Sequence, residues 1–113
     1  MRRMIVAFAA ALALGACATQ HEEASQEALA ADGREIAEAQ CASCHAVGPY
    51  GESPAPEAPP LRTVLSRYNA DVLEDELIQG IQVAHPMPEF QFSPQSVDAL
   101  IAYLQSIQEA PPQ

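Results

Sequence analysis

The sequence predicts an all-α domain. No part of the 113-residue chain has the alternating apolar and polar pattern of a half-buried strand. Segments rich in helix-forming residues are instead separated by loops that contain most of the ten prolines. The last segment is the clearest, because its apolar residues recur at helical spacing: Val97, Leu100, Ile101, Leu104 and Ile107. We therefore expect three main helices and some shorter helical pieces packed around one core.

The N-terminus predicts export from the cytoplasm. Two arginines precede Ile5–Leu14, an uncharged apolar run that is too short to span a bilayer, and this is the pattern of a signal peptide. Two cleavage sites overlap after it. Leu14-Gly15-Ala16-Cys17 resembles a bacterial lipobox, which would make Cys17 the lipidated first residue, whereas Ala16-Cys17-Ala18 also fits ordinary signal peptidase. We expect residues 1–17 to be a signal peptide of the lipoprotein type.

The composition after the signal peptide is strongly acidic. The chain has no lysine, and beyond the signal peptide fifteen acidic residues face only Arg34, Arg62 and Arg67, a formal charge of −12 for the protein part. Such a charge argues against nucleic acid and anionic lipid as partners. Residues 18–30 are small, polar and acidic, and we expect a flexible tether there, followed by one small domain over residues 31–110.

The domain is predicted to begin with a helix over Leu29–Gln40. Gly33 interrupts it at a cost of about 1 kcal/mol relative to alanine, so we expect another helix to approach closely there. Val47–Pro60 contains five prolines and two glycines and is predicted to be a loop. Leu61–Tyr68 is then predicted to be a short helix.

The second half of the domain is predicted to contain two longer helices. Either Asn69 or Asp71 caps a helix that runs to about Gln79, with Gly80 near its end. Ile81–Phe92 is predicted to be a loop. The last helix begins after Ser93, a good N-cap residue that is followed by a proline at the first helical position.

The most informative motif is Cys41-Ala42-Ser43-Cys44-His45. This C-x-x-C-H run is the attachment sequence of a c-type haem. Two thiols three residues apart can each form a thioether with one vinyl group, and the histidine that follows is placed to bind the iron. The thiol pair alone would also suit disulfide exchange or half of a zinc site. Cys17 belongs to the signal region, so no cysteine remains for a structural disulfide.

A second axial ligand of the iron can be chosen by elimination. Met87 is the only methionine beyond the signal peptide, and it stands between Pro86 and Pro88 just before the last helix. The prolines stiffen this segment in an extended form, which suits it to hold a thioether sulfur over the iron. Methionine ligation raises the reduction potential. His85 is the alternative ligand.

These motifs and their order resemble the class I c-type cytochromes, particularly the small bacterial members. The resemblance covers residues 33–107 and is carried by Gly33–His45, Ala58–Leu61, His85–Phe90 and Leu100–Leu104. It implies a fold of helices packed around one covalent haem, with Gly33 facing the last helix near Tyr103. It also implies that the Pro59 carbonyl, or that of Pro60, fixes the His45 ring through Nδ1.

Two further points concern the haem and its partners. Arg62 is predicted to pair with a haem propionate, since arginine binds carboxylates well, although a solvated surface arginine is the alternative. With His45 and Met87 on the iron, we expect a non-enzymatic periplasmic electron carrier whose redox partners offer a basic docking face. The alternatives are a ligand-binding or sensor haem protein, a cytochrome subunit of a membrane-bound dehydrogenase, or a thiol oxidoreductase.

Overall fold

The computed structural model describes residues 22, 25–81, 87–88 and 90–109. The signal peptide with Cys17, and the alternative ligand His85, lie outside these residues. Over the described part the chain is all-α, as predicted: a helix over residues 25–40, a short 3₁₀-helix and two further α-helices, with no strand among them. None of the described helices has the length and apolar character needed to cross a membrane.

The N-terminal helix begins earlier than the sequence analysis placed it. Residues 25–30, which we assigned to a flexible tether, are helical. Alanine, glutamate, glutamine and leucine are strong helix formers, so the first helix continues upstream without an interruption. The prediction of a flexible tether over residues 18–30 is therefore wrong for its last six residues.

Gly33 marks the point where this helix crosses the last one. A Cβ atom at Gly33 would collide with the Ala99 carbonyl group and lie 2.9 Å from the Tyr103 Cβ. One turn later Ala37 is fully buried. The predicted close approach is thus confirmed, and small side chains on the first helix are what allow it.

The middle of the chain forms two helices that meet at Asn69. The 3₁₀-helix η1 spans Leu61–Ser66, and α2 spans Ala70–Gln79. The Asn69 side chain accepts a hydrogen bond from the backbone N–H of Asp71, which decides between the two predicted caps. Gly80 ends α2 with a φ of 101°, a conformation that favours glycine.

The last helix, α3, spans Pro94–Ile107 and forms the centre of the domain. Ser93 caps it by accepting a hydrogen bond from the Ser96 N–H, and Pro94 begins it, as predicted. Its buried face carries the expected apolar stripe: Val97, Leu100, Ile101 and Leu104 are buried, and Ile107 is partly buried against them.

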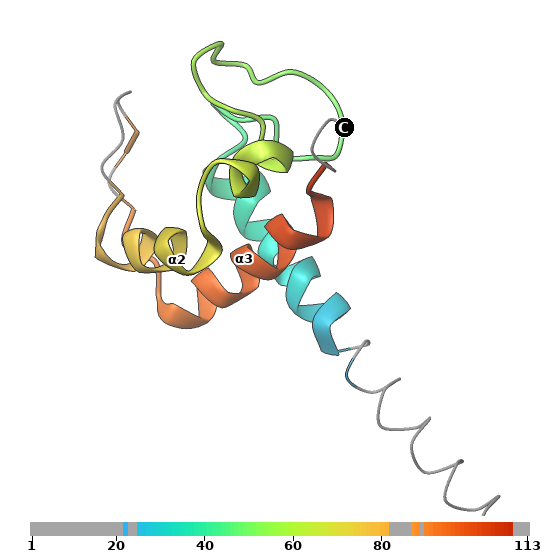
Figure 1. Cartoon of the computed structure of the whole chain (residues 1–113), viewed down its shortest axis with the longest axis vertical. Helices are drawn as coiled ribbons and strands as arrows, with labels where there is room; N and C mark the ends of the chain where they lie inside the picture. Colours follow the sequence, from blue (N-terminus) through green and yellow to red (C-terminus); the bar gives the residue numbers. More distant parts are fainter. Residues whose placement is uncertain (1–21, 23–24, 82–86, 89, 110–113) are drawn as a thin grey trace, which may run out of the picture.

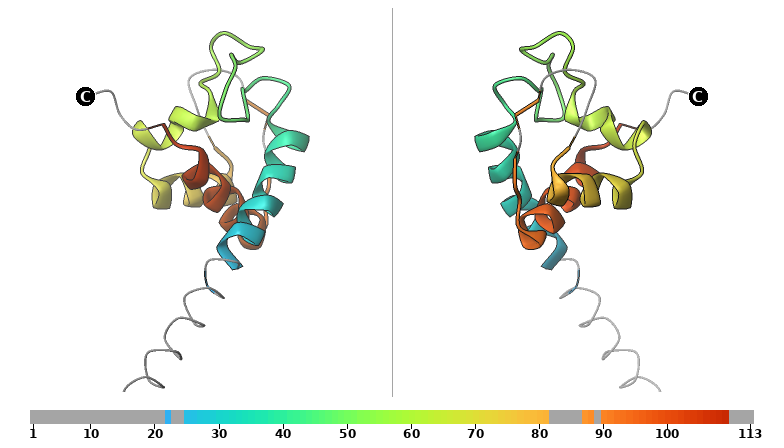
Figure 2. Two further views of the ribbon diagram at one scale, coloured as in Figure 1. Left: turned by 90° about the vertical axis from the view of Figure 1, so that its right-hand side faces the viewer. Right: turned by 90° about the vertical axis from the view of Figure 1, so that its left-hand side faces the viewer.

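The other three described helices pack around α3. It contacts both η1 and α2, and it crosses the N-terminal helix in the middle of the molecule (Figure 1). Seen from the sides, the N-terminal helix lies on one side of α3, and η1 and α2 lie on the other (Figure 2). The loop between the first helix and η1 arches over the end of the domain remote from α2.

The residues just after α3 fasten it to η1. The Gln108 amide group donates hydrogen bonds to the carbonyls of Leu61 and Leu104, both at 2.9 Å, and accepts one from the Leu65 N–H. The Glu109 N–H donates to the Arg62 carbonyl at 3.0 Å. These bonds satisfy backbone groups at the helix ends that would otherwise lack partners.

Candidate haem-binding site

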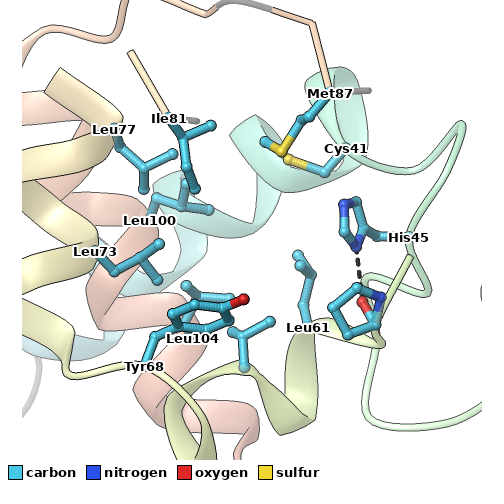
Figure 3. Close-up of a pocket in the computed structure, with 12 residues that line it drawn as sticks. Cys41, His45, Leu61, Tyr68, Leu73, Leu77, Ile81, Met87, Leu100 and Leu104 are labelled. Atoms are coloured by element: carbon cyan, nitrogen blue, oxygen red, sulfur yellow. Dashed lines mark hydrogen bonds between the residues drawn. The ribbon is translucent and has the colours of Figure 1, made fainter. Parts of the chain in front are cut away.

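An apolar cavity, partly open to solvent, lies between the helices. Every described helix or its adjoining segment contributes to its wall. The aliphatic lining residues are Leu61, Val64, Leu73, Leu77, Ile81, Leu100 and Leu104. The remaining lining residues are Cys41, His45, Pro59, Tyr68 and Met87, so the cavity collects four of the residues that the sequence analysis singled out (Figure 3).

The same cavity continues outward past the haem motif. An adjoining, more polar space shares Cys41, His45 and Met87 with the inner cavity. Exposed residues border it on the outer side: Gln40, Ser43, Cys44, Glu57 and Pro88. The combined space therefore has an apolar interior and one edge that opens to solvent beside Cys44.

His45 is held by a hydrogen bond to the chain itself. Its Nδ1 lies 2.7 Å from the Pro59 carbonyl oxygen, so Pro59, and not Pro60, makes the predicted contact (Figure 3). A carbonyl oxygen only accepts, so Nδ1 carries the proton and Nε2 keeps a free lone pair. That is the tautomer a metal-binding histidine requires.

Neighbouring bonds hold the Pro59 carbonyl in place. The Leu61 N–H donates to the Ala46 carbonyl at 2.9 Å, which joins the start of η1 to the residue after His45. The Tyr103 hydroxyl donates to the Val47 carbonyl at 2.7 Å and joins the same segment to α3. The segment that carries His45 is thus tied to η1 and to α3.

The two cysteines differ in their surroundings. Cys41 is partly buried in the cavity wall, and burial raises the pKa of its thiol to about 11. Cys44 is exposed at the cavity edge. A thiol oxidoreductase needs a thiol whose pKa is lowered, so the raised pKa of Cys41 gives that alternative no support.

Met87 reaches the cavity from the segment before α3. Its side chain is half-buried and points, with its sulfur, toward Cys41 and the interior (Figure 3). A thioether sulfur, an imidazole with a free Nε2 and two thiols on one apolar cavity are a donor set that fits a covalently attached haem. The residues present therefore fit the group that the motif implies.

Arg62 does not line the cavity. Its Nε donates to the Glu109 carboxylate at 2.7 Å, and its Nη1 donates to the Gly51 carbonyl at 2.9 Å. The guanidinium group thus joins η1, the C-terminal segment and the loop before η1. The predicted propionate contact has no support in this arrangement. Gln108 has a similar linking role, and no sequence pattern pointed to it.

The helices around one apolar cavity, with the C-x-x-C-H residues and Met87 in its wall, define a c-type cytochrome domain. The chain belongs to the family described as "Cytochrome C oxidase, cbb3-type, subunit III", whose pattern matches residues 28–104, well over half of the sequence. A cytochrome c domain of this kind implies covalent haem c and electron transfer with redox protein partners. Comparisons with curated proteins and with solved structures gave no match.

Proposed function

We propose that this protein is a periplasmic electron carrier with one haem, attached through Cys41 and Cys44 and ligated by His45 and Met87. The observation that carries the proposal is the arrangement of His45: its Nδ1–H is bonded to Pro59 while its ring borders the same cavity as Met87 and Cys41. A bound haem c supplies a one-electron Fe(III)/Fe(II) couple. The chain's own residues hold, orient and shield it.

The two proposed iron ligands would have complementary tasks. His45 offers Nε2 to the metal, and its bond to the Pro59 carbonyl increases the basicity of the ring. Met87 offers a soft sulfur, which favours the ferrous state and raises the reduction potential. The aliphatic walls keep water away and raise the potential further by disfavouring the more highly charged ferric state. With both positions filled, no site is open for a substrate.

A spectroscopic experiment tests this proposal against the ligand-binding alternative. We expect the ferric holoprotein to show the weak far-red absorption band of sulfur ligation, and the ferrous form to resist carbon monoxide. Rapid carbon monoxide binding by the wild-type protein would instead favour a sensor or ligand-binding function. The intact mass of the purified protein should exceed that of the processed chain by one haem.

The proposal includes anchoring at the membrane. Cys17 in the lipobox-like sequence would carry several acyl chains, and multiple chains anchor a protein stably. The experiment is fractionation of the wild-type protein and of Cys17→Ser. We expect the wild type in the membrane fraction and the variant in the soluble periplasm. A soluble wild-type protein that begins at Thr19 would instead support ordinary cleavage.

The family description favours a second candidate. It names a subunit of an oxidase, which favours a place for this domain inside a membrane-bound redox enzyme, although the alternative considered from the sequence was a dehydrogenase subunit and not an oxidase subunit. The electron-carrying chemistry is the same, but the partner is permanent. Mild detergent extraction followed by size-exclusion chromatography separates the two: a free carrier elutes alone, and a subunit elutes with a larger haem-containing complex.

A further inference from the structure

The loop over residues 48–57 borders the exposed edge of the haem cavity. Ala55 and Glu57 line the outer part of the cavity together with Cys44. The loop is fastened at three places: the Gly51 carbonyl accepts from Arg62 Nη1, the Ser53 hydroxyl accepts from the Ala46 N–H, and the Ala55 N–H donates to the Cys44 carbonyl. Its course is therefore set by the haem motif and η1.

The loop exposes an aromatic side chain. Tyr50 is 87% exposed, more than either of the other large exposed apolar residues, Tyr68 and Val72. It stands between Pro49, whose φ is fixed by its ring, and Gly51, whose φ of 91° favours glycine. A tyrosine on a stiff loop loses little conformational freedom on binding, and tyrosines of this kind are frequent anchors of interfaces.

The loop's own charged residues are all acidic, and Arg62, the cation that touches it at Gly51, is paired with Glu109. Between Arg34 and Arg62 the sequence has four acidic residues and no lysine or arginine. Glu38 is paired with Arg34 at 2.7 Å. Glu52 and Glu57, both exposed, lie on the loop itself. A partner that approaches this loop, which borders the open edge through Ala55 and Glu57, therefore meets Tyr50 and two carboxylates.

We propose that residues 48–57 are the docking surface for a basic redox protein, with Tyr50 as the apolar anchor and Glu52 and Glu57 as the charged contacts. The proposal rests on the electron-carrier function proposed above. Docking on this loop brings the partner beside Cys44, where the cavity opens to solvent. The acidic α2 is the competing surface, and it lies at the other end of the domain (Figure 1).

Cross-linking of the holoprotein maps the surface directly. The probe is a lysine-rich mitochondrial cytochrome c, joined by a water-soluble carbodiimide that links carboxylates to lysines. Because this chain has no lysine, its carboxylates are the groups that react with the lysines of the probe. We expect Glu52 and Glu57 in the cross-linked peptides. Cross-links confined to Asp71, Glu74, Asp75 or Glu76 would overturn the proposal.

Charge-matched variants give a kinetic test. In Glu52→Gln/Glu57→Gln the rate of oxidation of the ferrous holoprotein by tris(phenanthroline)cobalt(III), a cation, should fall by roughly threefold or more at low salt, because local charge steers the encounter. Asp75→Asn/Glu76→Gln removes the same charge from α2 and should have a smaller effect. Equal effects would show that only net charge matters and would contradict a specific surface.

The aromatic anchor is tested by affinity for the same cytochrome c probe. Tyr50→Ala should weaken binding by roughly tenfold, as expected of an interface anchor, whereas Val72→Ala, an exposed apolar residue on α2, should leave it unchanged. Equal affinities of the two variants would remove Tyr50 from the proposal. Oxidation by hexacyanoferrate(III) is the control: if it stays rapid while the docking tests fail, the carrier function stands without this surface.

Discussion

The two sides of the haem cavity are built in different ways. On the His45 side, hydrogen bonds from His45, Leu61 and Tyr103 connect the segment that carries His45 to η1 and α3. On the other side, Met87 stands between Pro86 and Pro88 in the sequence. The His45 side is thus fixed by bonds between distant segments, whereas for Met87 the sequence predicts local stiffness from the two neighbouring prolines. Exchange of Met87 should therefore have local effects, whereas damage on the His45 side should spread.

Removal of both thiols should disrupt the His45 side and the Met87 side of the cavity alike, so that the difference between them disappears. Without covalent haem, Cys41→Ala/Cys44→Ala loses the group that fills the apolar cavity, and a domain of this size is marginal without it. We expect a largely unfolded protein, with most of the far-ultraviolet helical signal lost. A double variant as helical as the wild type would show that the helices pack without the haem.

Met87→Ala is the strongest change confined to one side. We expect a folded protein with covalent haem, a reduction potential lower by roughly a few tenths of a volt, within the total span of about 0.8 V that axial ligands cover, and binding of carbon monoxide. The measurements are redox titration and visible absorption. If the potential is unchanged and carbon monoxide does not bind, Met87 is not the ligand and His85 becomes the candidate.

Tyr103→Phe tests how far the His45 side depends on its bonds. The variant loses the hydrogen bond to the Val47 carbonyl, and we expect a loss of about 1 kcal/mol in the free energy of unfolding. Chemical denaturation measures it. An unchanged free energy would mean that packing alone holds this segment.

The same variant should change the response to alkaline pH. Burial raises the pKa of Tyr103 above its usual value near 10. The folded state therefore keeps the phenol neutral where the unfolded chain ionises, so wild-type stability falls as the pH rises above about 10. The stability of Tyr103→Phe should lack this contribution to the decrease. If the free energies of unfolding of the two proteins decrease in parallel as the pH rises, the buried phenol is not responsible.

The smallest effect is expected from Arg62→Gln. The Arg62–Glu109 pair is partly exposed, with 59% of the Glu109 side chain accessible, so its loss should cost at most about 1 kcal/mol in unfolding. We expect the potential and its pH dependence to stay the same. A clear shift in either would revive the predicted propionate contact and show that Arg62 acts on the haem. Glu109→Gln is the matched control, because it breaks the pair and keeps the arginine.

Local chemistry made much of the fold predictable. Ser93 and Pro94 start α3 because capping and proline geometry depend on adjacent residues, and Gly80 ends α2 for the same reason. Gly33 also led to a correct prediction. A glycine inside a helix lowers its stability, and a close helix crossing explains why glycine stands there. The first helix was placed too far downstream because acidic and small residues were taken as a tether, although they also favour helix.

The sequence by itself predicts the haem chemistry of this protein: the C-x-x-C-H motif indicates covalent attachment within five consecutive residues, and Met87 is singled out as the only methionine of the domain. Tertiary structure alone decided that Pro59 and not Pro60 holds His45, that Arg62 bonds Glu109 and Gly51, and that Gln108 fastens α3 to η1. These contacts join residues 11 to 47 positions apart. Each of these polar side chains has several possible hydrogen-bond partners, and the packing of the helices decides which partner lies within reach. The local sequence does not specify where the packed helices place those partners.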